Sequence, residues 1–396
     1  MTLPTTTKTS GARSRKTSTA TSLLQFLENE LNTIINDIRQ LVQLESPSDN
    51  KASVDRLGEF LATKFADIGG RPKFHPVTNR GDHLQVDFPG GTNLPPVTLL
   101  GHFDTVWPLG TLDKMPCTVR DGRLFGPGSY DMKSGIALLL HAIRGLREMH
   151  GALPRPVTVM LNTDEEVGSH SSRAIIERLA TQSAAVLIME PSGGNGALKT
   201  ARKGVGEYCL KVIGKPAHAG IAPTDGASAV LEIAHQIVRI SKLTNLRRGI
   251  TANVGVVEGG TRSNVIAAEA SALIDVRIAK VRDAAYVDKR LHALKPLNRQ
   301  CRLELAGAIN RLPMERTPGV ARLFATAKRL AKELGWNLQE TSTGGASDGN
   351  FTAALGVPTL DGMGGVGEGA HAFNESVIID ELPRRAALIA MLIEAV

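Results

Sequence analysis

Acidic residues stand directly after several apolar runs of this sequence, and the clearest case is the pair Glu165–Glu166. The pair follows the run Val157–Leu161, which we interpret as a buried strand. Adjacent carboxylates repel each other, and loss of water raises their pKa unless a cation or a basic group neutralises them. An isolated pair of this kind is most often a solvated turn. Because α/β sheets place their chemistry at strand ends, the neighbouring motifs decide between the two interpretations.

Residues of the same kinds follow other apolar runs. His102 and Asp104 are separated by one residue at a strand end, so both side chains leave the same face. A carboxylate so placed can orient a histidine that binds a metal through its other ring nitrogen. Further candidates stand at a glycine-rich bend, at a third strand end and in a glycine-rich loop: Asp131, Glu190 and His371. Each is weak alone, but together they predict one site at one edge of a sheet.

Two histidines and three acids from this set would suit a pair of borderline-hard divalent ions. Zinc is the leading candidate, and Co²⁺ or Mn²⁺ are alternatives. The predicted ligands are His102, Asp131, Glu166, Glu190 and His371. Glu165 is left over, and we expect it to be the base that acts on a metal-bound water.

Composition limits the other classes of function. The chain has 396 residues, 42% of them hydrophobic and 21% charged, which is typical of a globular protein too long for one ordinary core. Four positive charges of the net +7 lie in the first 20 residues, so the remainder is only mildly basic and nucleic-acid binding is not indicated. No apolar run approaches the roughly 20 residues of a membrane span. The three distant cysteines are interpreted as reduced thiols.

The first 22 residues are basic, rich in serine and threonine, and free of acidic residues. This composition has some similarity to an organellar transit peptide, but it lacks the apolar segment of a secretory signal. We predict a disordered tail over residues 1–22 and a cytoplasmic protein.

Hydrophobic periodicity predicts the order of the elements. The chain begins with one helix over Leu23–Val42 and a second over Val54–Ile68. Strands near 84–88, 97–101, 157–161 and 185–189 then alternate with helices, which favours a largely parallel sheet covered by helices. From about 205 to 309 the order is β-α-β-β-α-β, which is ferredoxin-like. Helices near 320–334 and after 381 resume the first pattern.

These elements predict an α/β catalytic domain interrupted by a smaller α+β domain. The expected catalytic domain is discontinuous, over residues 23–203 and 314–396, and the expected insertion covers residues 204–313.

At this point the sequence resembles the dinuclear zinc exopeptidases and deacylases of the M20 type, and most of all their glutamate carboxypeptidase (carboxypeptidase G2-like) branch. The resemblance covers nearly all of the chain after residue 22. The segments that carry it are Gly101–Val106, Gly126–Gly135, Thr163–Ser169, Glu190–Pro191 and Ala370–His371.

The resemblance implies roles for these residues. His102, Asp131 and Glu190 would hold one zinc ion. Asp131, Glu166 and His371 would hold the other, so that Asp131 bridges both. Asp104 would orient His102, and Glu165 would be the general base. The family also has a ferredoxin-like lid inserted in its zinc-peptidase core, in agreement with the order of elements found above.

Further segments resemble the family's lid and substrate motifs. The segment Gly214–Gly220 implies that His218 stabilises the oxyanion, and Asn264 and Arg277 lie in segments that would grip a substrate carboxylate. The segment Gly344–Gly349 resembles a substrate-side loop, and its predicted contacts are Gly345 and Ser347. The resemblance also implies a homodimer paired through the lid, in which His218 acts on the partner's site. Ala346 departs from the family's pattern, since relatives often have a third glycine there.

The expected activity is hydrolysis of an amide bond beside a free C-terminal carboxylate, with a small peptide as substrate and C-terminal glutamate as a candidate leaving residue. The alternative within the enzyme class is an N-acyl-amino-acid deacylase, whose substrates have the same free carboxylate. The alternative from another class is a non-catalytic relative that binds amino acids or peptides. Such a protein would be expected to lack a ligand or the base, and this sequence lacks neither.

Overall fold

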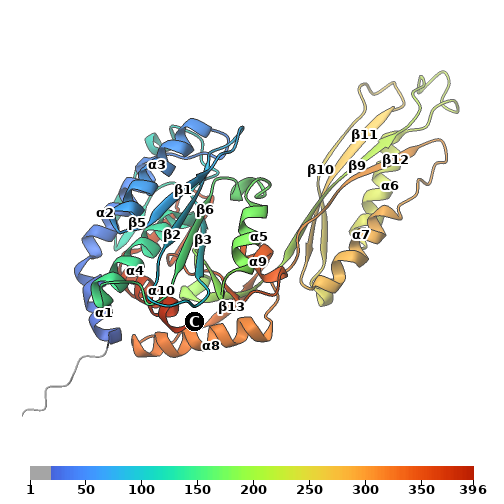
Figure 1. Cartoon of the computed structure of the whole chain (residues 1–396). Helices are drawn as coiled ribbons and strands as arrows, with labels where there is room; N and C mark the ends of the chain where they lie inside the picture. Colours follow the sequence, from blue (N-terminus) through green and yellow to red (C-terminus); the bar gives the residue numbers. More distant parts are fainter. Residues whose placement is uncertain (1–18) are drawn as a thin grey trace, which may run out of the picture.

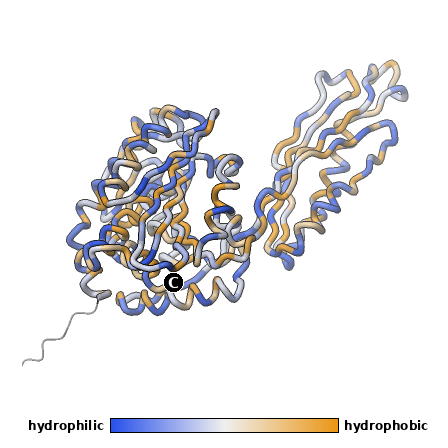
Figure 2. Tube along the Cα trace, viewed as in Figure 1, coloured by the Kyte–Doolittle hydropathy of each residue, from blue (hydrophilic) through white to orange (hydrophobic). Residues whose placement is uncertain are grey.

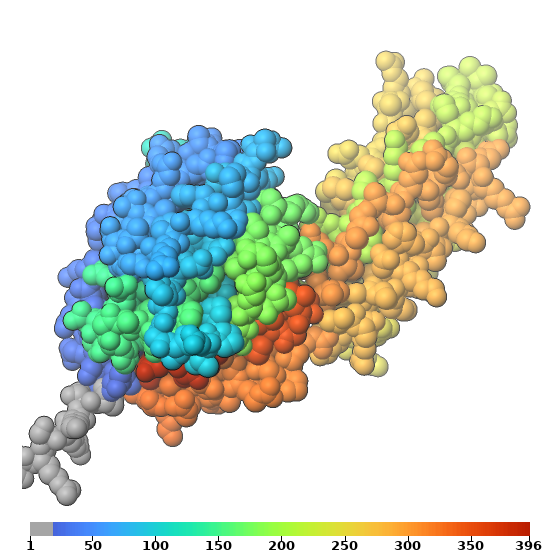
Figure 3. Space-filling view, in the orientation of Figure 1, coloured from blue at the N-terminus to red at the C-terminus, as the bar shows by residue number. Residues whose placement is uncertain are grey.

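The computed structural model of the protein describes residues 19–396. It consists of a large body, in which helices cover a central sheet, and an elongated inserted unit, which we define as residues 204–311 (Figure 1). In the space-filling view the inserted unit projects from the large body and touches it only at one end (Figure 3). The predicted disordered tail lies, up to residue 18, outside the described residues, and the first helix begins at Thr19.

The central sheet of the large body has six strands in the order β1-β2-β6-β3-β7-β14. Strands β6, β3, β7 and β14 run parallel, and at one edge β2 pairs antiparallel with both β6 and β1. The predicted mixed and largely parallel sheet is therefore confirmed. The bounds are β1 Arg71–His75, β2 His83–Phe88, β3 Val97–His102, β6 Val157–Asn162, β7 Ala185–Ile188 and β14 Thr359–Leu360.

Helices cover both faces of this sheet because consecutive side chains of its buried strands point to opposite sides. In β3, Leu99 packs into the larger core with α3, α4 and α10, whereas Leu100 packs into a smaller core with α5 and α9. Hydrophobic residues accordingly follow the central strands and the inner sides of the helices (Figure 2). The helices of this body are α1 Thr19–Asn29, α2 Leu31–Gln43, α3 Lys51–Asp67, α4 Ser134–His150, α5 Arg173–Thr181, α8 Pro318–Glu333, α9 Gly349–Ala354 and α10 Leu382–Ala395.

Two features of the large body differ from the predictions. The single helix expected over Leu23–Val42 is two helices, because the chain turns at Glu30 between α1 and α2. Several short strands were not predicted, since runs of two to five residues have too little periodicity to detect. One of them is β1 of the central sheet, and the others form two small sheets: β8 Leu198–Arg202 with β13 Glu340–Thr343, and β4 Thr118–Arg120, β5 Arg123–Phe125, β15 Gly367–Glu368 and β16 Ser376–Ile378.

The inserted unit has the predicted β-α-β-β-α-β order, with a four-stranded antiparallel sheet in the order β10-β11-β9-β12. Its bounds are β9 Gly204–Ile213, α6 Ala229–Ser241, β10 Thr251–Gly259, β11 Glu269–Ile278, α7 Ala284–His292 and β12 Arg302–Arg311. Residues Ile274, Val276 and Ile278 of β11 face a core shared with Ile240 of α6 and Leu291 of α7, so the two helices cover one face of the sheet. The first residue of the inserted unit, Gly204, and its last residue, Arg311, lie at the same end of the unit, and this end joins the large body.

Two further predictions concern residues described here. Cys117, Cys209 and Cys301 are all free thiols, as predicted. Among residues 19–396, no helix combines the length and the apolar character that a membrane span requires.

A buried charged cluster joins three helices of the large body. The carboxylate of Asp37 in α2 accepts hydrogen bonds from Lys64 of α3 at 2.8 Å and His141 of α4 at 2.9 Å. Burial alone would raise the pKa of Asp37, but the hydrogen bonds from His141 and Lys64 outweigh it and lower the pKa. The charged form of Asp37 is therefore the one that stabilises the fold.

We expect Asp37→Ala to lower the free energy of unfolding by about 3 kcal/mol, because the buried His141 and the half-buried Lys64 lose their acceptor. The contribution of Asp37 should be full above the ordinary carboxyl pKa of about 3.9 and should disappear as the pH falls through its lowered folded value. Urea unfolding of both proteins at several pH values measures the difference. Glu333→Ala, which breaks the exposed pair with Arg329, is the control and should show no measurable change. Equal stability of Asp37→Ala and the parent protein would contradict the prediction.

Candidate metal centre

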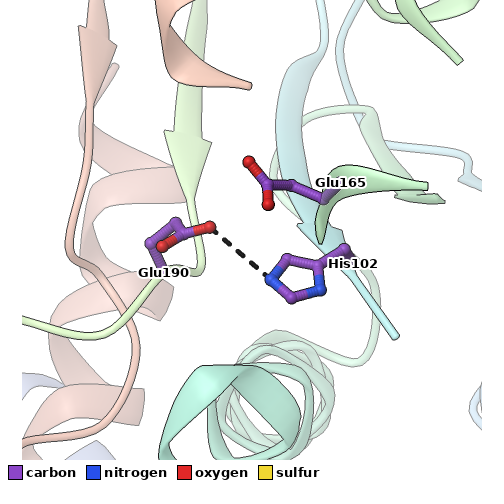
Figure 4. Close-up of side chains that lie close together, drawn as sticks. All are labelled: His102, Glu165 and Glu190. Carbon is purple, nitrogen blue, oxygen red and sulfur yellow. Dashed lines mark ion pairs between the residues drawn. The ribbon is translucent and has the colours of Figure 1, made fainter. Parts of the chain in front are cut away.

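Three neighbouring parallel strands deliver the predicted residues to one edge of the central sheet. Strand β3 ends at His102, β6 is followed by Glu165 and Glu166, and β7 is followed by Glu190. Figure 4 shows the side chains of His102, Glu165 and Glu190 directed toward a common space, with the ion pair between His102 and Glu190 dashed. The convergence predicted from strand ends is thus present in the structure.

The structure also brings Asp131 and His371 to this edge. His102 Nε2 lies 3.3 Å from Asp131 Oδ1 and 3.6 Å from Glu190 Oε1. His371 Nε2 lies 3.5 Å from Asp131 Oδ2 and 3.3 Å from Glu166 Oε2. Asp131 therefore stands between the two histidines, with one carboxylate oxygen toward each. All five predicted ligands lie in one continuous cluster.

Close packing places the loop of Asp131 and the end of β7 next to each other. Gly135, in the first turn of α4, lies so near Met189 that a Cβ atom would be 2.1 Å from the Met189 carbonyl oxygen. Only glycine fits this approach. Because Met189 precedes Glu190, the contact fixes the start of α4 against the strand end that carries Glu190.

The orientation of His102 follows the prediction for Asp104. His102 Nδ1 lies 3.0 Å from the backbone oxygen of Asp104 and 3.4 Å from its carboxylate oxygen Oδ1. Asp104 is fully buried, and its other carboxylate oxygen accepts a hydrogen bond of 2.7 Å from Ser48. Nδ1 therefore donates toward Asp104, and Nε2 is left to face Asp131 and Glu190.

The donor set suits a divalent cation. Asp131 Oδ1 and Glu166 Oε1 are buried and accept no hydrogen bond from any described residue. A buried carboxylate oxygen without a partner is costly, and a cation would remove that cost. Ligand atoms of His102, Asp131 and Glu166 lie within 4.8 Å of one another, as do those of His102, Glu165 and Glu190. Imidazole and carboxylate are ligands that zinc accepts.

The pKa values of the cluster indicate the same need for positive charge. Hydrogen bonds to Asp131 and Glu166 raise the pKa of His371 to about 10. Burial and the charge of Asp131 raise the pKa of Glu190 to about 7 despite the nearby Arg202. Glu190 and His371 therefore hold their protons more tightly than usual, and a bound dication would supply the positive charge that those protons supply here.

Glu165 differs from Glu166 in its partner. Arg311 Nη2 lies 3.3 Å from Glu165 Oε1 and also contacts Ser169 at 2.7 Å and Asp348 at 3.0 Å. Burial, then the charges of Asp348 and Glu190, raise the pKa of Glu165 well above its usual range. Glu165 thus has a counter-ion within the protein, whereas Glu166 keeps an unpartnered oxygen. This difference favours Glu166 as the ligand and Glu165 as the base.

A buried arginine joins Glu190 to the predicted substrate-side loop. Arg202, at the end of β8, pairs with Asp361 through two nitrogens and lies 3.3 Å from Glu190 Oε2. It also donates to the backbone oxygen of Gly345 at 3.2 Å, and Ser347 donates to Asp361 at 2.6 Å. Gly345 is therefore connected to the predicted ligand Glu190 through Arg202, and Ser347 is connected to it through Asp361 and Arg202.

Sequence reasoning did not identify Arg202 or Arg311. The burial of β8 alternates along its five residues, and Arg202 is on the buried side. The residue types of this segment do not alternate between apolar and polar, so no sequence signal marked Arg202. Arg311 ends β12, and its partners are distant in sequence, so the local pattern held no signal for it.

The predicted residues of the inserted unit are not brought to the cluster. Ile213, which precedes the segment of His218, pairs with Glu269 at the far end of the sheet. A strand of this length places that end roughly 30 Å from Gly204. His218 and Asn264 lie together there, since Ala219 N donates to the Asn264 backbone oxygen.

Arg277 lies at the opposite end of the same sheet. It is paired in register with Val205, and its guanidinium binds the carboxylate of Asp275, with Nη2 at 2.7 Å from Oδ2. Asn264 and Arg277, predicted to act on one substrate carboxylate, are therefore far apart within one chain. Because both residues belong to the inserted unit, a joint role on one substrate requires that they come from two different chains.

Comparisons with known proteins agree with this geometry. The family model for "Peptidase family M20/M25/M40" matches residues 98–395. The chain is similar to carboxypeptidase G2 of Pseudomonas sp. (strain RS-16), with 31% identity over 94% of this chain and 91% of that protein. It is also similar to an acetylornithine deacetylase of Myxococcus xanthus, with 28% identity over 83% of this chain and 85% of that protein.

Among solved structures, the chain resembles aminopeptidase PepT of Bacillus cereus ATCC 10987. The TM-score is 0.79 at 26% identity, over 92% of this chain and 98% of that chain. The resemblance inferred from the motifs is therefore confirmed at the level of both sequence and fold.

We expect the purified protein to contain close to two divalent ions per chain. The variant His371→Ala should contain roughly one ion fewer, because His371 is the histidine on the Glu166 side of Asp131. Elemental analysis after dialysis measures the content, and chelators should abolish activity that zinc restores. His235→Ala removes an exposed histidine of α6 and should leave the content unchanged. A fully active preparation without metal would end the interpretation as a metal centre.

Proposed function

The chain belongs to peptidase family M20/M25/M40 and is an enzyme of the metallopeptidase and amidohydrolase class; on this premise we propose that it is a carboxypeptidase-like hydrolase. Its substrate is a small peptide or N-acyl amino acid, cut at the amide bond beside a free C-terminal carboxylate. The observation that supports the proposal is the contact of Glu165 with Arg311, which gives this glutamate a counter-ion within the protein although it lies beside His102 and Glu190.

The residues present would hold two zinc ions, one with His102, Asp131 and Glu190 and one with Asp131, Glu166 and His371. Zinc in such a site acidifies a water molecule and polarises the scissile carbonyl. Co²⁺ or Mn²⁺ would serve the same donor set.

Glu165 is the proton carrier in this proposal. Its carboxylate takes a proton from the attacking water and later delivers it to the leaving amine. The raised pKa of Glu165 suits this double task, because the group must hold the proton between the two transfers. Arg311 keeps the carboxylate in place through its contact of 3.3 Å and prevents repulsion by Asp348 from displacing it.

His218 is proposed to stabilise the oxyanion of the tetrahedral intermediate. Its Nδ1 accepts hydrogen bonds from the backbone nitrogens of Gly220 at 3.2 Å and Ile221 at 3.1 Å. The ring proton of the neutral histidine is therefore on Nε2, where it can be donated. Asn264 and Arg277 are proposed to bind the substrate carboxylate, for which the planar guanidinium of arginine is well matched.

We propose that the inserted unit is a lid that also pairs two chains. His218 lies at the end of the unit that is remote from its own cluster, so a second copy of the chain is the simplest source of a histidine for each site. A homodimer in which His218 acts on the partner's substrate satisfies this geometry.

An N-acyl-amino-acid deacylase is the second candidate, favoured by the similarity to an acetylornithine deacetylase. Both activities require the same centre and the same free carboxylate. Turnover by zinc-loaded enzyme of matched substrates, in which the acyl group and the C-terminal residue are varied separately, distinguishes them. Dependence of kcat/KM mainly on the C-terminal residue, with glutamate preferred, supports the carboxypeptidase. Dependence mainly on a small acyl group supports the deacylase.

Glu165→Gln should lower kcat by 10²–10⁴-fold or more, because the amide keeps the shape but cannot accept the proton. Its metal content should equal that of the parent protein. Glu166→Gln is the matched comparison and should lose metal together with activity. If Glu165→Gln keeps near-parental turnover or loses metal instead, the roles of the two glutamates are reversed.

Complementation tests the dimer. His218→Ala and Glu165→Gln should each be inactive alone. In a mixed dimer one site then carries both lesions and the other carries neither, so random mixing should restore about one quarter of the parental activity. Mixing two differently tagged His218→Ala samples is the control and should restore none. If mixed dimers form but remain inactive, His218 works within its own chain or has no role.

A further inference from the structure

Glu375 is a buried acid that no motif identified and that the proposed reaction does not use. It follows His371 by four residues and precedes β16, and its side chain is fully buried. Its carboxylate accepts four hydrogen bonds. Oε1 accepts from the backbone nitrogens of Tyr130 and Asp131, both at 2.9 Å, and Oε2 accepts from Gly128 N at 2.8 Å and Trp107 Nε1 at 2.9 Å.

Three of these donors belong to the short loop that carries Asp131. Gly126 and Gly128 both have positive φ, and the resulting bend turns the nitrogens of residues 128, 130 and 131 toward one point. Converging backbone N–H groups of this kind form a nest for an anion. The anion here is the side chain of Glu375, and one of the bonds is to the nitrogen of Asp131 itself.

The same carboxylate fixes the loop of His371. The backbone nitrogen of Glu375 donates to Ala372 O at 2.9 Å, and Ala372 N donates to Gly369 O at 2.8 Å, so the loop is compact. His371 has φ of 61°, a left-handed conformation that is strained for histidine and that surrounding contacts must maintain. Glu375 supplies such a contact, because its side chain binds the loop to the neighbouring one.

Trp107 extends the connection to the segment that follows His102. Its indole N–H binds Glu375, and its ring lies against that of Phe373, with centroids 5.5 Å apart. Glu375 therefore belongs to the loop of His371 and binds two further segments, those of Asp131 and of His102, so the three segments that it connects carry three of the five proposed ligands.

We propose that Glu375 is a positioning residue that sets the separation of Asp131 and His371 and so preforms the site before metal binds. The inference rests on the proposed metal centre. A carboxylate is required, because only an acceptor with two oxygens satisfies all four donors. In glutamine, one oxygen would be replaced by an NH₂ group facing two N–H groups.

The test compares Zn²⁺ binding by the metal-free, full-length parent and Glu375→Gln, with a chromophoric chelator as competitor. We expect the affinity to fall by 10–100-fold, the usual effect of removing a partner that supports the ligands. Hydrogen exchange in the metal-free proteins should show faster exchange of the amides of residues 128, 130 and 131 in the variant. Glu368→Gln is the matched control: it lies in the same loop, its ion pair with Arg123 is exposed, and it should change neither quantity.

Trp107→Phe removes one of the four donors and should weaken zinc binding by less than Glu375→Gln. This variant decides the question if Glu375→Gln does not fold, because unchanged affinity in Trp107→Phe then overturns the proposal. Urea unfolding distinguishes a role of Glu375 in positioning the metal ligands from a role in the overall stability of the fold. A folded Glu375→Gln that loses stability but binds two zinc ions with parental affinity also overturns the proposal. Failure of the parent to bind zinc would instead remove the proposed metal centre itself.

Discussion

Repulsion among buried carboxylates is the constraint on which the rest of this structure depends. Asp131, Glu165, Glu166 and Glu190 lie within a few ångströms of one another at the edge of a sheet, where water does not screen them fully. The protein holds them together in two ways. Arginines pair with Glu165 and Glu190, and histidines lie beside Asp131, Glu166 and Glu190. The oxygens that remain without partners mark where a cation completes the arrangement.

Much of this arrangement follows from the sequence because it depends on local pattern. Apolar runs of four to six residues predicted the parallel strands, and polar residues directly after them predicted the edge at which His102, Glu166 and Glu190 meet. The family resemblance added the roles of individual residues, and the comparisons confirm the family. The β-α-β-β-α-β order of the inserted unit was visible for the same reason, since each of its strands and helices is long enough to show its period.

What the sequence did not reveal depends on contacts between distant residues. Arg202 meets Asp361, Arg311 meets Glu165, and Glu375 meets the loop of Asp131, in each case across more than 140 positions. No local period signals such a pair. His218 is remote from the cluster because it follows the far end of β9, and the predicted strand alone did not show how the inserted unit is placed against the large body. The break between α1 and α2 was missed because Glu30 is a good helix former in a continuous apolar pattern.

The chain passes between its two bodies only twice, and each passage adjoins an arginine of the cluster. Arg202 immediately precedes the first passage, and Arg311 ends the strand that leads into the second. Any rotation of the inserted unit must pivot within a few residues of both guanidinium groups. Those groups are the counter-ions of Glu190 and Glu165. The residues that connect the inserted unit to the large body are thus also those that balance the charge of Glu165 and Glu190, so a rotation of the inserted unit would change the electric field at these two carboxylates.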